Sequence, residues 1–273
     1  MTRMINKDTK ICMSLAARPT NFGTRFHNYL YDALDLDYLY KAFTTHDLAA
    51  AIGGVKALGI RGCAISMPFK QACIPLIDEL DESARVINAV NTIVNTEGYL
   101  KGYNTDYIAI TTLLKKYQVS GDLTFALKGS GGMAKAVACA LKNLGFKQGY
   151  IIARDEDSGK ELAEAYQYEY RPSMAGLAPA LLINATPVGM SGGPDADTLS
   201  FSADEVGTAE IVFDVVALPE QTPLIRYAQE KQKTVISGAE VFAIQAVEQF
   251  YLYTGVRPSD ELFKKAAAYA RQI

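Results

Sequence analysis

Short apolar runs alternate with amphipathic segments along most of the chain, and this alternation predicts α/β structure. Continuous apolar runs are typical of buried parallel strands, whereas apolar positions three and four residues apart indicate helices. The strand-like runs cover 62–66, 89–94, 123–127, 150–154, 181–184 and 211–215. One helical pattern begins near Pro68, and the pattern after the glycine-rich turn ends before Gly145. Further helical patterns cover 107–117, 157–166, 245–254 and 259–272. From residue 56 onward the pattern therefore predicts successive βαβ units.

Turn residues refine this outline. Glu97-Gly98 predicts a hairpin that joins 89–94 to a strand over 99–103. Asp106 stands where the N-cap of the next helix is expected, and 191–194 is expected to be loop. At 273 residues the chain exceeds the usual size of one domain. We therefore expect two domains joined near this helix.

A glycine-rich turn is the most informative local motif. It follows the apolar run 123–127 and opens a helical run, which is the context that a dinucleotide-binding turn requires. Its residues are Gly129, Ser130, Gly131, Gly132, Met133 and Ala134. Gly129 permits the tight turn, Gly131 lets the backbone approach a pyrophosphate, and Ala134 is small enough for the helix to pack on its strand. We predict a nucleotide or dinucleotide site here; a glycine turn without a ligand is the alternative.

Composition excludes several classes of function. The chain has 27 basic and 30 acidic residues and a net charge of −3, so it offers neither a basic face for nucleic acid nor a polybasic membrane anchor. It contains no long apolar run, and its four cysteines are scattered without a Cys-x-x-Cys pair. With only two histidines, a multi-histidine metal site is excluded. We expect a cytoplasmic protein that is a monomer or homodimer, binds no metal and acts on a small molecule.

Lysine, carboxylate or tyrosine side chains must then carry any acid–base chemistry. Lys70 falls in the first turn expected after Pro68, where the helix dipole disfavours a cation and favours a neutral amine. Such a lysine can serve as a general base, although a solvated lysine is the alternative. Asn91 and Asp106 lie at the ends of their elements, where polar side chains face a cleft. For Asp106, helix capping and catalysis both remain open.

The residues after the strand 150–154 bear on the cofactor. Arg154 could stack on adenine and pair with a 2′-phosphate, whereas Asp155 and Glu156 would accept hydrogen bonds from an unmodified ribose. A role for either acidic residue at the start of the next helix is equally open.

Six ordered motifs resemble those of the shikimate dehydrogenases over nearly the whole chain. They are Ser66-Met67-Pro68-Phe69-Lys70, Ala89-Val90-Asn91-Thr92, Gly102-Tyr103-Asn104-Thr105-Asp106, the glycine turn, Asn184-Ala185-Thr186-Pro187-Val188-Gly189-Met190 and Gln245-Ala246. The resemblance implies reversible, NADP-dependent oxidation of a ring hydroxyl of shikimate, with NAD as the alternative cofactor. It also implies a substrate-binding catalytic domain over 1–106, a Rossmann-type doubly wound domain over 107–240, and C-terminal helices over 241–273 that return to the first domain.

The resemblance assigns roles to individual residues. Lys70 and Asp106 would be catalytic. The substrate would contact Ser14, Asn21, Ser66, Asn91 and Gln245. The cofactor would contact the six turn residues together with Arg154, Asn184, Thr186, Val215 and Gly238.

Three departures from the family pattern bear on the substrate and the cofactor. The family's N-terminal serine pair, which holds the substrate carboxylate, is replaced by Asn21-Phe22-Gly23-Thr24, so that Asn21, Thr24, Ser14 or Arg18 would take over. Ala217 stands where the family has a tyrosine, and Ala153-Arg154-Asp155 replaces Asn-Arg-Thr. We therefore predict a shikimate dehydrogenase-like enzyme whose best substrate is shikimate, quinate or an amino-substituted relative. A dinucleotide-binding sensor without useful catalysis is the alternative from another class, and a folate dehydrogenase fits the later motifs less well.

Overall fold

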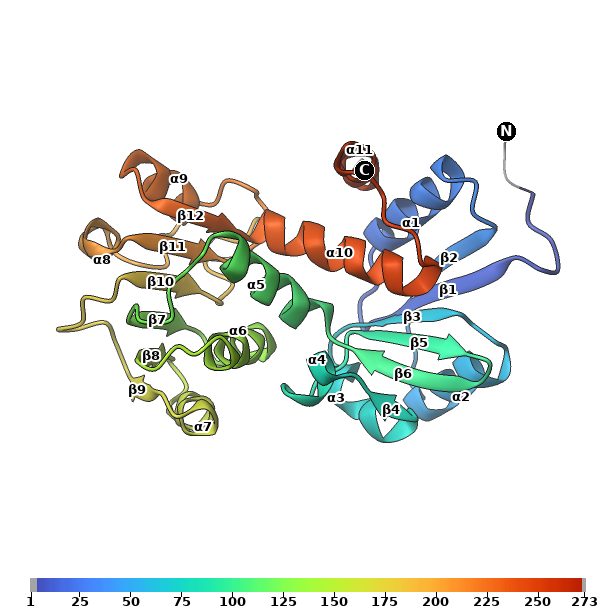
Figure 1. The fold of residues 1–273 in the computed structure, drawn as a ribbon, viewed down its shortest axis with the longest axis horizontal. Helices are drawn as coiled ribbons and strands as arrows, with labels where there is room; N and C mark the ends of the chain where they lie inside the picture. The colour runs from blue at the N-terminus through green and yellow to red at the C-terminus, as the bar shows by residue number, and fades with distance from the viewer. Residues whose placement is uncertain (1–3, 272–273) are drawn as a thin grey trace. The chain divides into compact units, whose positions relative to one another are not determined.

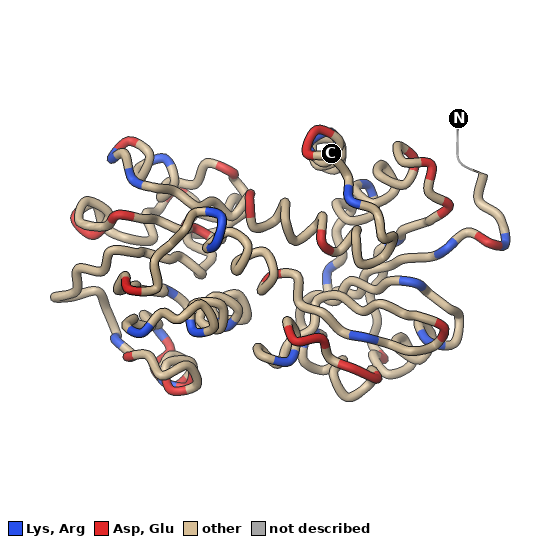
Figure 2. The backbone as a smooth tube through the Cα atoms, viewed as in Figure 1, with Lys and Arg blue, Asp and Glu red and all other residues tan. Residues whose placement is uncertain are grey.

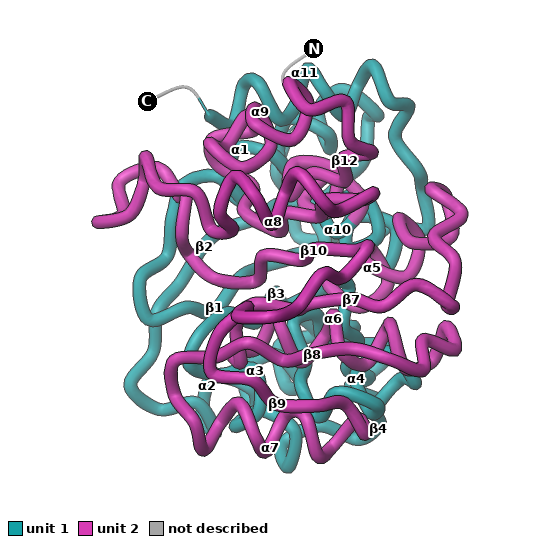
Figure 3. Tube along the Cα trace, turned by 90° about the vertical axis from the view of Figure 1, so that its left-hand side faces the viewer, with its two compact units in different colours: residues 1–105, 245–273 teal, residues 106–244 magenta. Residues whose placement is uncertain are grey.

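A computed structural model describes residues 4–271 and divides them into two compact units (Figures 1 and 3). Within that range, unit 1 comprises the residues up to 105 and those from 245 onward, and unit 2 comprises residues 106–244. The chain passes between the units inside two helices, α5 (Thr105–Lys116) and α10 (Gly238–Thr254).

Unit 1 contains a mixed sheet with strand order β2-β1-β3-β5-β6-β4. Its strands are β1 (Lys10–Leu15), β2 (Tyr38–Phe43), β3 (Gly62–Ile65), β4 (Glu79–Leu80), β5 (Thr92–Thr96) and β6 (Tyr99–Tyr103). Its helices include α1 (Asn21–Ala33), α2 (Leu48–Ala57), α3 (Phe69–Ala72), η1 (Ile74–Leu76), α4 (Glu82–Arg85) and α11 (Asp260–Ala270). Strands β1, β2 and β3 are parallel, whereas β5 is antiparallel to β3 and β6. The expectation of a βαβ unit from the strand at 62–66 to the strand at 89–94 is therefore wrong, because β3 and β5 pair antiparallel.

The hairpin between β5 and β6 is confirmed. Glu97 and Gly98 have φ of 52° and 86°, and two successive residues with positive φ match the right-handed twist of the flanking strands. The strand before the turn begins at Thr92 rather than at residue 89. Asn91 therefore lies just before the strand, where its side chain is not committed to the pleat of the sheet.

Two apolar clusters pack among the described residues of unit 1. One is rich in aromatic residues and joins α1, β2, α10 and α11, with Phe26, Tyr31, Phe250 and Tyr253 completely or almost completely buried. The other joins α2 to β1, β3 and β5 and contains Ile52. The predicted return of the C-terminal helices to the first domain is confirmed, because residues from 245 onward belong to unit 1.

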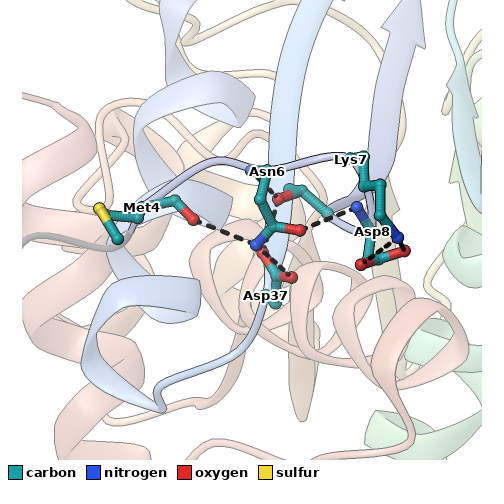
Figure 4. A network of polar contacts seen from close by, with 6 residues as sticks. Met4, Asn6, Lys7, Asp8 and Asp37 are labelled. Atoms are coloured by element: carbon teal, nitrogen blue, oxygen red, sulfur yellow. Dashed lines mark hydrogen bonds and ion pairs between the residues drawn. The ribbon is translucent and has the colours of Figure 1, made fainter.

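Polar contacts anchor the start of the chain to the strand β2. The Thr9 hydroxyl donates to Asp37 Oδ1 at 2.7 Å, and the Asn6 backbone N–H donates to Thr9 Oγ1 at 2.9 Å. Asn6 Nδ2 also reaches Asp37 Oδ2 at 3.4 Å (Figure 4). These contacts hold the segment before β1 against the residue that leads into β2.

Unit 2 is a doubly wound parallel sheet with strand order β12-β11-β10-β7-β8-β9. Its strands are β7 (Phe125–Lys128), β8 (Gly149–Ile152), β9 (Glu169–Arg171), β10 (Leu181–Asn184), β11 (Ile211–Asp214) and β12 (Thr234–Ser237). The helices between them are α6 (Gly132–Asn143), α7 (Glu156–Tyr166), α8 (Ala203–Thr208) and α9 (Pro223–Glu230). This is the six-stranded Rossmann order, and ligands bind such sheets where the order reverses, here between β7 and β10. The predicted fold class is confirmed.

Among residues 4–271, no helix combines the length and apolar character needed to cross a membrane. Figure 2 shows that basic and acidic residues are interspersed along the backbone within each unit.

Candidate functional site

Backbone hydrogen bonds bring several predicted residues to one edge of the sheet in unit 1. The Ile65 N–H donates to the Asn91 carbonyl at 2.8 Å, and the Asn91 N–H donates to the Tyr103 carbonyl at 3.0 Å. The Ser66 N–H donates to Leu15 at 2.9 Å. The ends of β1, β3 and β6 therefore meet the start of β5, and Ser66 and Asn91 lie at this meeting point.

The Asn91 amide is oriented by its neighbours. Its Oδ1 accepts from Thr92 Oγ1 and from the Thr105 backbone N–H, both at 2.9 Å, and its Nδ2 donates to Thr105 Oγ1 at 3.0 Å. The side chain is 3% exposed. Because an amide nitrogen carries two N–H groups and the described residues use one, Asn91 can present the second to a ligand as a donor.

Lys70 lies close to Asn91 through the backbone. Its carbonyl accepts from the Val90 N–H at 2.8 Å, and its side chain is half-buried. The helix α3 has four residues, and Pro68 is its N-cap rather than its first residue. A single turn sums few peptide dipoles, so the argument from a helix dipole at Lys70 is wrong. The case for Lys70 as a candidate general base therefore rests on the position of its backbone beside Asn91.

Asp106 does not cap a helix. The helix α5 begins at Thr105, which places Asp106 inside the first turn, where it is 4% exposed. The preceding Thr105 is the residue that bonds Asn91 with both its backbone N–H and its hydroxyl. The predicted capping role is therefore wrong. Instead, Thr105, which precedes Asp106, is hydrogen-bonded to Asn91 at the end of the sheet.

The residues expected near a substrate carboxylate have different environments. Asn21 is the exposed first residue of α1, and Arg18 is exposed just before it. The Thr24 hydroxyl accepts from the Ala42 N–H at 3.2 Å, and the half-buried Ser14 bonds the Tyr40 hydroxyl. Thr24 and Ser14 thus serve contacts within the unit, whereas Asn21 and Arg18 are accessible.

A chain of buried and part-buried hydrogen bonds supports Asn91, and the sequence predictions did not include it. His27 Nε2 lies 3.3 Å from Gln249 Oε1, and Gln249 Nε2 donates to Thr92 Oγ1 at 2.9 Å. Thr92 in turn donates to Asn91. Gln249 lies on α10, one turn after the predicted substrate residue Gln245, and the side chain of Gln245 is half-buried. The one signal in the sequence was a second glutamine four residues after the first.

His27 is enclosed by aromatic rings. It is 3% exposed and stacks on Tyr40 with ring centroids 4.3 Å apart, and its Nδ1 has no partner among the described residues. Burial lowers the pKa of His27 to about 4. The unfolded chain, with a pKa near 6.5, therefore takes up a proton before the native state does. The stability that neutral His27 contributes is fully present above pH 6.5 and is lost as the pH falls toward 4.

We expect His27→Phe to remove this dependence on pH while keeping the stacking on Tyr40. From the pKa difference, the wild-type free energy of unfolding should lose about 3 kcal/mol more than that of the variant between pH 7 and pH 4. Urea unfolding of both proteins at several pH values measures the difference.

The comparison with the variant is necessary because Asp214 has the opposite effect. Burial raises the pKa of Asp214 to about 6, against hydrogen bonds from Thr222, Val216 and Asn184. Its native state holds a proton that the unfolded chain releases, so this contribution to stability is lost as the pH rises through 6. Asp214 is present in both proteins, so its contribution cancels in the difference between their free energies of unfolding. Equal slopes for wild type and His27→Phe would contradict the prediction.

In unit 2, the glycine turn connects β7 to α6 at the switch point of the sheet. Gly129 has a φ of +121°, and a Cβ there would lie 2.8 Å from the Ala185 carbonyl oxygen. Gly131 is the N-cap of α6 and makes no side-chain capping bond, and Ser130 Oγ lies 2.8 Å from Ser158 Oγ. The first N–H groups of this twelve-residue helix can therefore bind an anion. Beyond these residues, Gly132 and Met133 form the first turn, and Ala134 is fully buried.

A pocket of about 940 Å³ opens beside this turn. Its lining includes Gly129, Ser130, Gly131, Arg154 and Thr186 from the predicted cofactor set, together with Lys128, which was not predicted. Asp155 also lines it, but its carboxylate caps α7 by accepting from the Ser158 N–H at 2.8 Å. Hydrogen bonds from Ser158 lower the pKa of Asp155. Asp155 therefore takes the role at a helix start that the sequence left open.

The remaining predicted residues lie around the switch point without lining this pocket. Asn184 is fully buried; its Nδ2 donates to Asp214 Oδ1 at 2.9 Å and its Oδ1 accepts from Thr186 Oγ1 at 2.6 Å. Val215 donates its N–H to the Asn184 carbonyl at 3.0 Å. A Cβ on Gly238 would overlap the Val216 carbonyl, so the start of α10 packs directly on the residues that follow β11. Asn184 thus holds Thr186 in place.

Other chemistry finds little support in residues 4–271. They contain no group of three His, Cys, Asp or Glu side chains arranged to hold a metal ion. All four cysteines lie in this range, are buried and form no disulfide. Ala217, where the family has a tyrosine, is half-buried just beyond β11.

The chain is similar in sequence and fold to known proteins over almost all of its length. Residues 22–93 match the shikimate dehydrogenase substrate binding domain. A shikimate dehydrogenase-like protein of Haemophilus influenzae is 55% identical over 98% of this chain and 99% of its own length. A shikimate dehydrogenase (NADP(+)) of Chlorobium chlorochromatii is 34% identical over 96% and 97%.

Solved structures agree with these relatives. One of a shikimate 5-dehydrogenase-like protein superimposes with a TM-score of 0.96 at 55% identity, covering 98% of this chain and 100% of that one. Shikimate 5-dehydrogenase from Thermus thermophilus, solved with NADP(H) and shikimate, has a TM-score of 0.82 at 27% identity, covering 96% and 99%. With the six ordered motifs, the Rossmann order of unit 2 and relatives of this identity and coverage, the chain belongs to the shikimate dehydrogenase family.

Proposed function

We propose that this protein is an NADP-dependent oxidoreductase that reversibly oxidises a ring hydroxyl of shikimate, or of a close relative, to the ketone. The observation that carries the proposal is the edge of the sheet in unit 1. There the Lys70 carbonyl is hydrogen-bonded to the Val90 N–H, the Asn91 side chain is hydrogen-bonded to Thr105, and Asp106 follows Thr105 in the chain. Oxidation of a secondary alcohol requires a group that takes the hydroxyl proton, and a lysine supported by a carboxylate and an amide donor can serve as that group.

Residues of unit 1, together with Asp106 at the first position of unit 2, supply the acid–base chemistry in this proposal. In the direction of oxidation, the neutral amine of Lys70 takes the proton from the reacting hydroxyl, and in reduction its ammonium returns a proton to the carbonyl oxygen. Asp106 orients the amine. Asn91 donates its remaining N–H to a substrate oxygen, while Ser66 and Gln245 contribute further polar contacts.

Unit 2 supplies the cofactor site. The residues fit a dinucleotide: the pyrophosphate would lie on the N–H groups at the start of α6, and Arg154 would face the adenosine ribose. NADP, when bound, accepts or returns the hydride. The role of Asn184, Val215 and Gly238 in this proposal is to shape the switch point, and the half-buried Thr186, which lines the pocket, contacts the cofactor.

The substrate need not be shikimate itself. The replacement of the family's serine pair by 21–24, and of its tyrosine by Ala217, changes two polar contacts. Losing such a contact weakens discrimination strongly when its partner stays unpaired. Quinate and amino-substituted relatives are therefore tested beside shikimate, with Asn21 and Arg18 as the accessible partners for a carboxylate.

The test is to follow nicotinamide absorbance while purified protein is incubated with shikimate, quinate, aminoshikimate and a polyol panel, each with NADP and with NAD. We expect turnover of at least one cyclic hydroxy acid with NADP, and the ratio of kcat/KM values identifies the preferred one. The matched control is the Lys70→Ala protein purified from the same host, because it reports any contaminating dehydrogenase.

A second outcome would contradict the proposal. If the protein binds NADPH but oxidises none of these compounds above the Lys70→Ala background, the fold serves as a dinucleotide-binding sensor. The same panel therefore separates an enzyme of this family from a protein that has kept only its cofactor site.

A further inference from the structure

Lys128 occupies an unusual position in the dinucleotide pocket. It is the last residue of β7, a strand whose other residues are fully buried and apolar, and it directly precedes Gly129. Its side chain is half-buried and lines the pocket together with Arg154. A charged residue at the end of such a strand carries a desolvation cost, and burial lowers the pKa of its ammonium group.

Contacts within the protein use only part of the hydrogen-bonding capacity of the Lys128 ammonium group. Nζ donates to the Ser200 carbonyl and lies 5.3 Å from the centroid of the Phe201 ring. Glu205 acts on it electrostatically, but among residues 4–271 no carboxylate forms an ion pair with it. An ammonium group has three N–H donors, so Lys128 keeps donors for a ligand in the pocket.

Ser200 supplies an independent sign of a ligand. The residue is 2% exposed and lines the same pocket, and its Oγ is buried without a hydrogen-bond partner in the described part of the chain. Buried hydroxyl groups nearly always have a partner. The unsatisfied hydroxyl belongs to the same residue whose carbonyl accepts from Lys128, so two polar groups with spare capacity lie together.

The register of the sheet places Lys128 near the residue expected to read the ribose. Lys128 pairs with Ile152 across the parallel strands β7 and β8, and Arg154 follows two residues later. Of the two acidic residues that line the pocket, Asp155 is turned toward the start of α7 and Asp195 is exposed. The balance of charge at this end of the pocket favours an anion.

We propose that Lys128, together with Arg154, binds the 2′-phosphate on the adenosine ribose of NADP and thereby selects NADP over NAD. The inference rests on the proposed function for the presence of a dinucleotide. It assigns to the end of β7 a positive charge that offsets Asp155, which stands where relatives that prefer NADP have threonine. Ser200 adds a hydroxyl donor to the same phosphate.

The test measures binding rather than turnover. Dissociation constants for NADPH, NADH, adenosine 2′,5′-bisphosphate and AMP are determined by calorimetry for wild type, Lys128→Met and Lys160→Met. Methionine keeps the length and apolar stem of lysine. Lys160 is an exposed residue of α7 that pairs with Glu156, so its variant changes the net charge of unit 2 equally without touching the pocket.

We expect Lys128→Met to weaken the binding of NADPH and of the bisphosphate about tenfold or more. The dissociation constants of NADH and AMP should change less than about twofold, and Lys160→Met should bind all four ligands as the wild type does. Equal weakening of both dinucleotides, or no change in either, would overturn the inference. Should the variant not fold, rising salt must lower the wild-type preference for NADPH over NADH, because charge pairing is screened. A preference insensitive to salt would likewise overturn it.

These outcomes are separable from those of the proposed function. A protein that binds NADPH through Lys128 but oxidises no hydroxy acid would refute the enzymatic proposal and leave this inference standing. Turnover of a hydroxy acid with equal use of NADP and NAD would do the reverse.

Discussion

Replacing Lys70 with alanine is expected to lower kcat about a thousandfold while leaving the dissociation constant for NADPH unchanged. General acid–base catalysis by one positioned group contributes factors of this size. Lys70 lies in unit 1, whereas the dinucleotide pocket is lined by residues of unit 2, so cofactor binding has no reason to change. Steady-state kinetics with the best substrate of the panel and a fluorescence titration with NADPH measure the two quantities.

Two further variants distinguish proton transfer from electrostatic attraction. Lys70→Arg keeps the positive charge but cannot release a proton near neutral pH, so it should be almost as slow as Lys70→Ala. Lys56→Ala removes a lysine of the same unit that is half-exposed and paired with Asp78, and it should turn over at the wild-type rate. A Lys70→Arg protein with nearly full activity would show that the charge alone is needed.

Asp106 provides a check on the same assignment. If it acts on the substrate through Lys70, Asp106→Asn should slow the wild type markedly but have little additional effect on Lys70→Ala, because residues that work as a unit are not additive. Additive losses would mean that Asp106 acts separately from Lys70.

The Rossmann half of the fold was predictable because its central strands are buried on both faces. Continuous apolar runs mark such strands, and 181–184 coincides with β10 while 211–215 exceeds β11 by one residue. The glycine turn was predictable for a related reason: Gly129 adopts a φ that favours glycine, and that requirement is visible in the sequence.

The first half of unit 1 was not predicted, for physical reasons. The edge strand β2 and the half-covered strand β1 mix polar and apolar residues, so neither shows a continuous run. Asn28 holds α1 to β2 by bonding both the N–H and the carbonyl of Tyr40, a contact that no local pattern announces. The helix α10 begins at Gly238, seven residues before the expected start, because its first turn packs on the residues that follow β11.

The candidate site divides in the same way. Lys70, Asn91 and Asp106 could be predicted as site residues because each belongs to a local motif, whereas His27 and Gln249 support Asn91 through contacts between residues more than 150 positions apart. Helix capping also misled the analysis: Asp106 has the right residue type for an N-cap, but the helix begins one residue earlier. Long-range packing decides such boundaries, and it leaves no periodic trace in the chain.

Replacing Gly129 with alanine is expected to destabilise unit 2 by about 2 kcal/mol and to weaken NADPH binding at least about tenfold. At a φ of +121° an L side chain is strained, and the new Cβ would meet the Ala185 carbonyl carbon at 3.0 Å as well as its oxygen. Relief of this overlap must move β7 away from the segment after β10, which is the switch point where the pyrophosphate would lie. Thermal unfolding and NADPH titration measure both effects.

The matched control is Gly132→Ala, three residues along the same turn. A Cβ at Gly132 meets no atom within 4 Å, and the residue is the exposed first position of α6, where alanine favours the helix. The melting temperature should therefore stay level or rise slightly. If Gly129→Ala is as stable as Gly132→Ala and binds NADPH as tightly as wild type, the turn tolerates a side chain at its tightest point. The close approach of Gly129 to Ala185 would then not be what holds the cofactor site in shape.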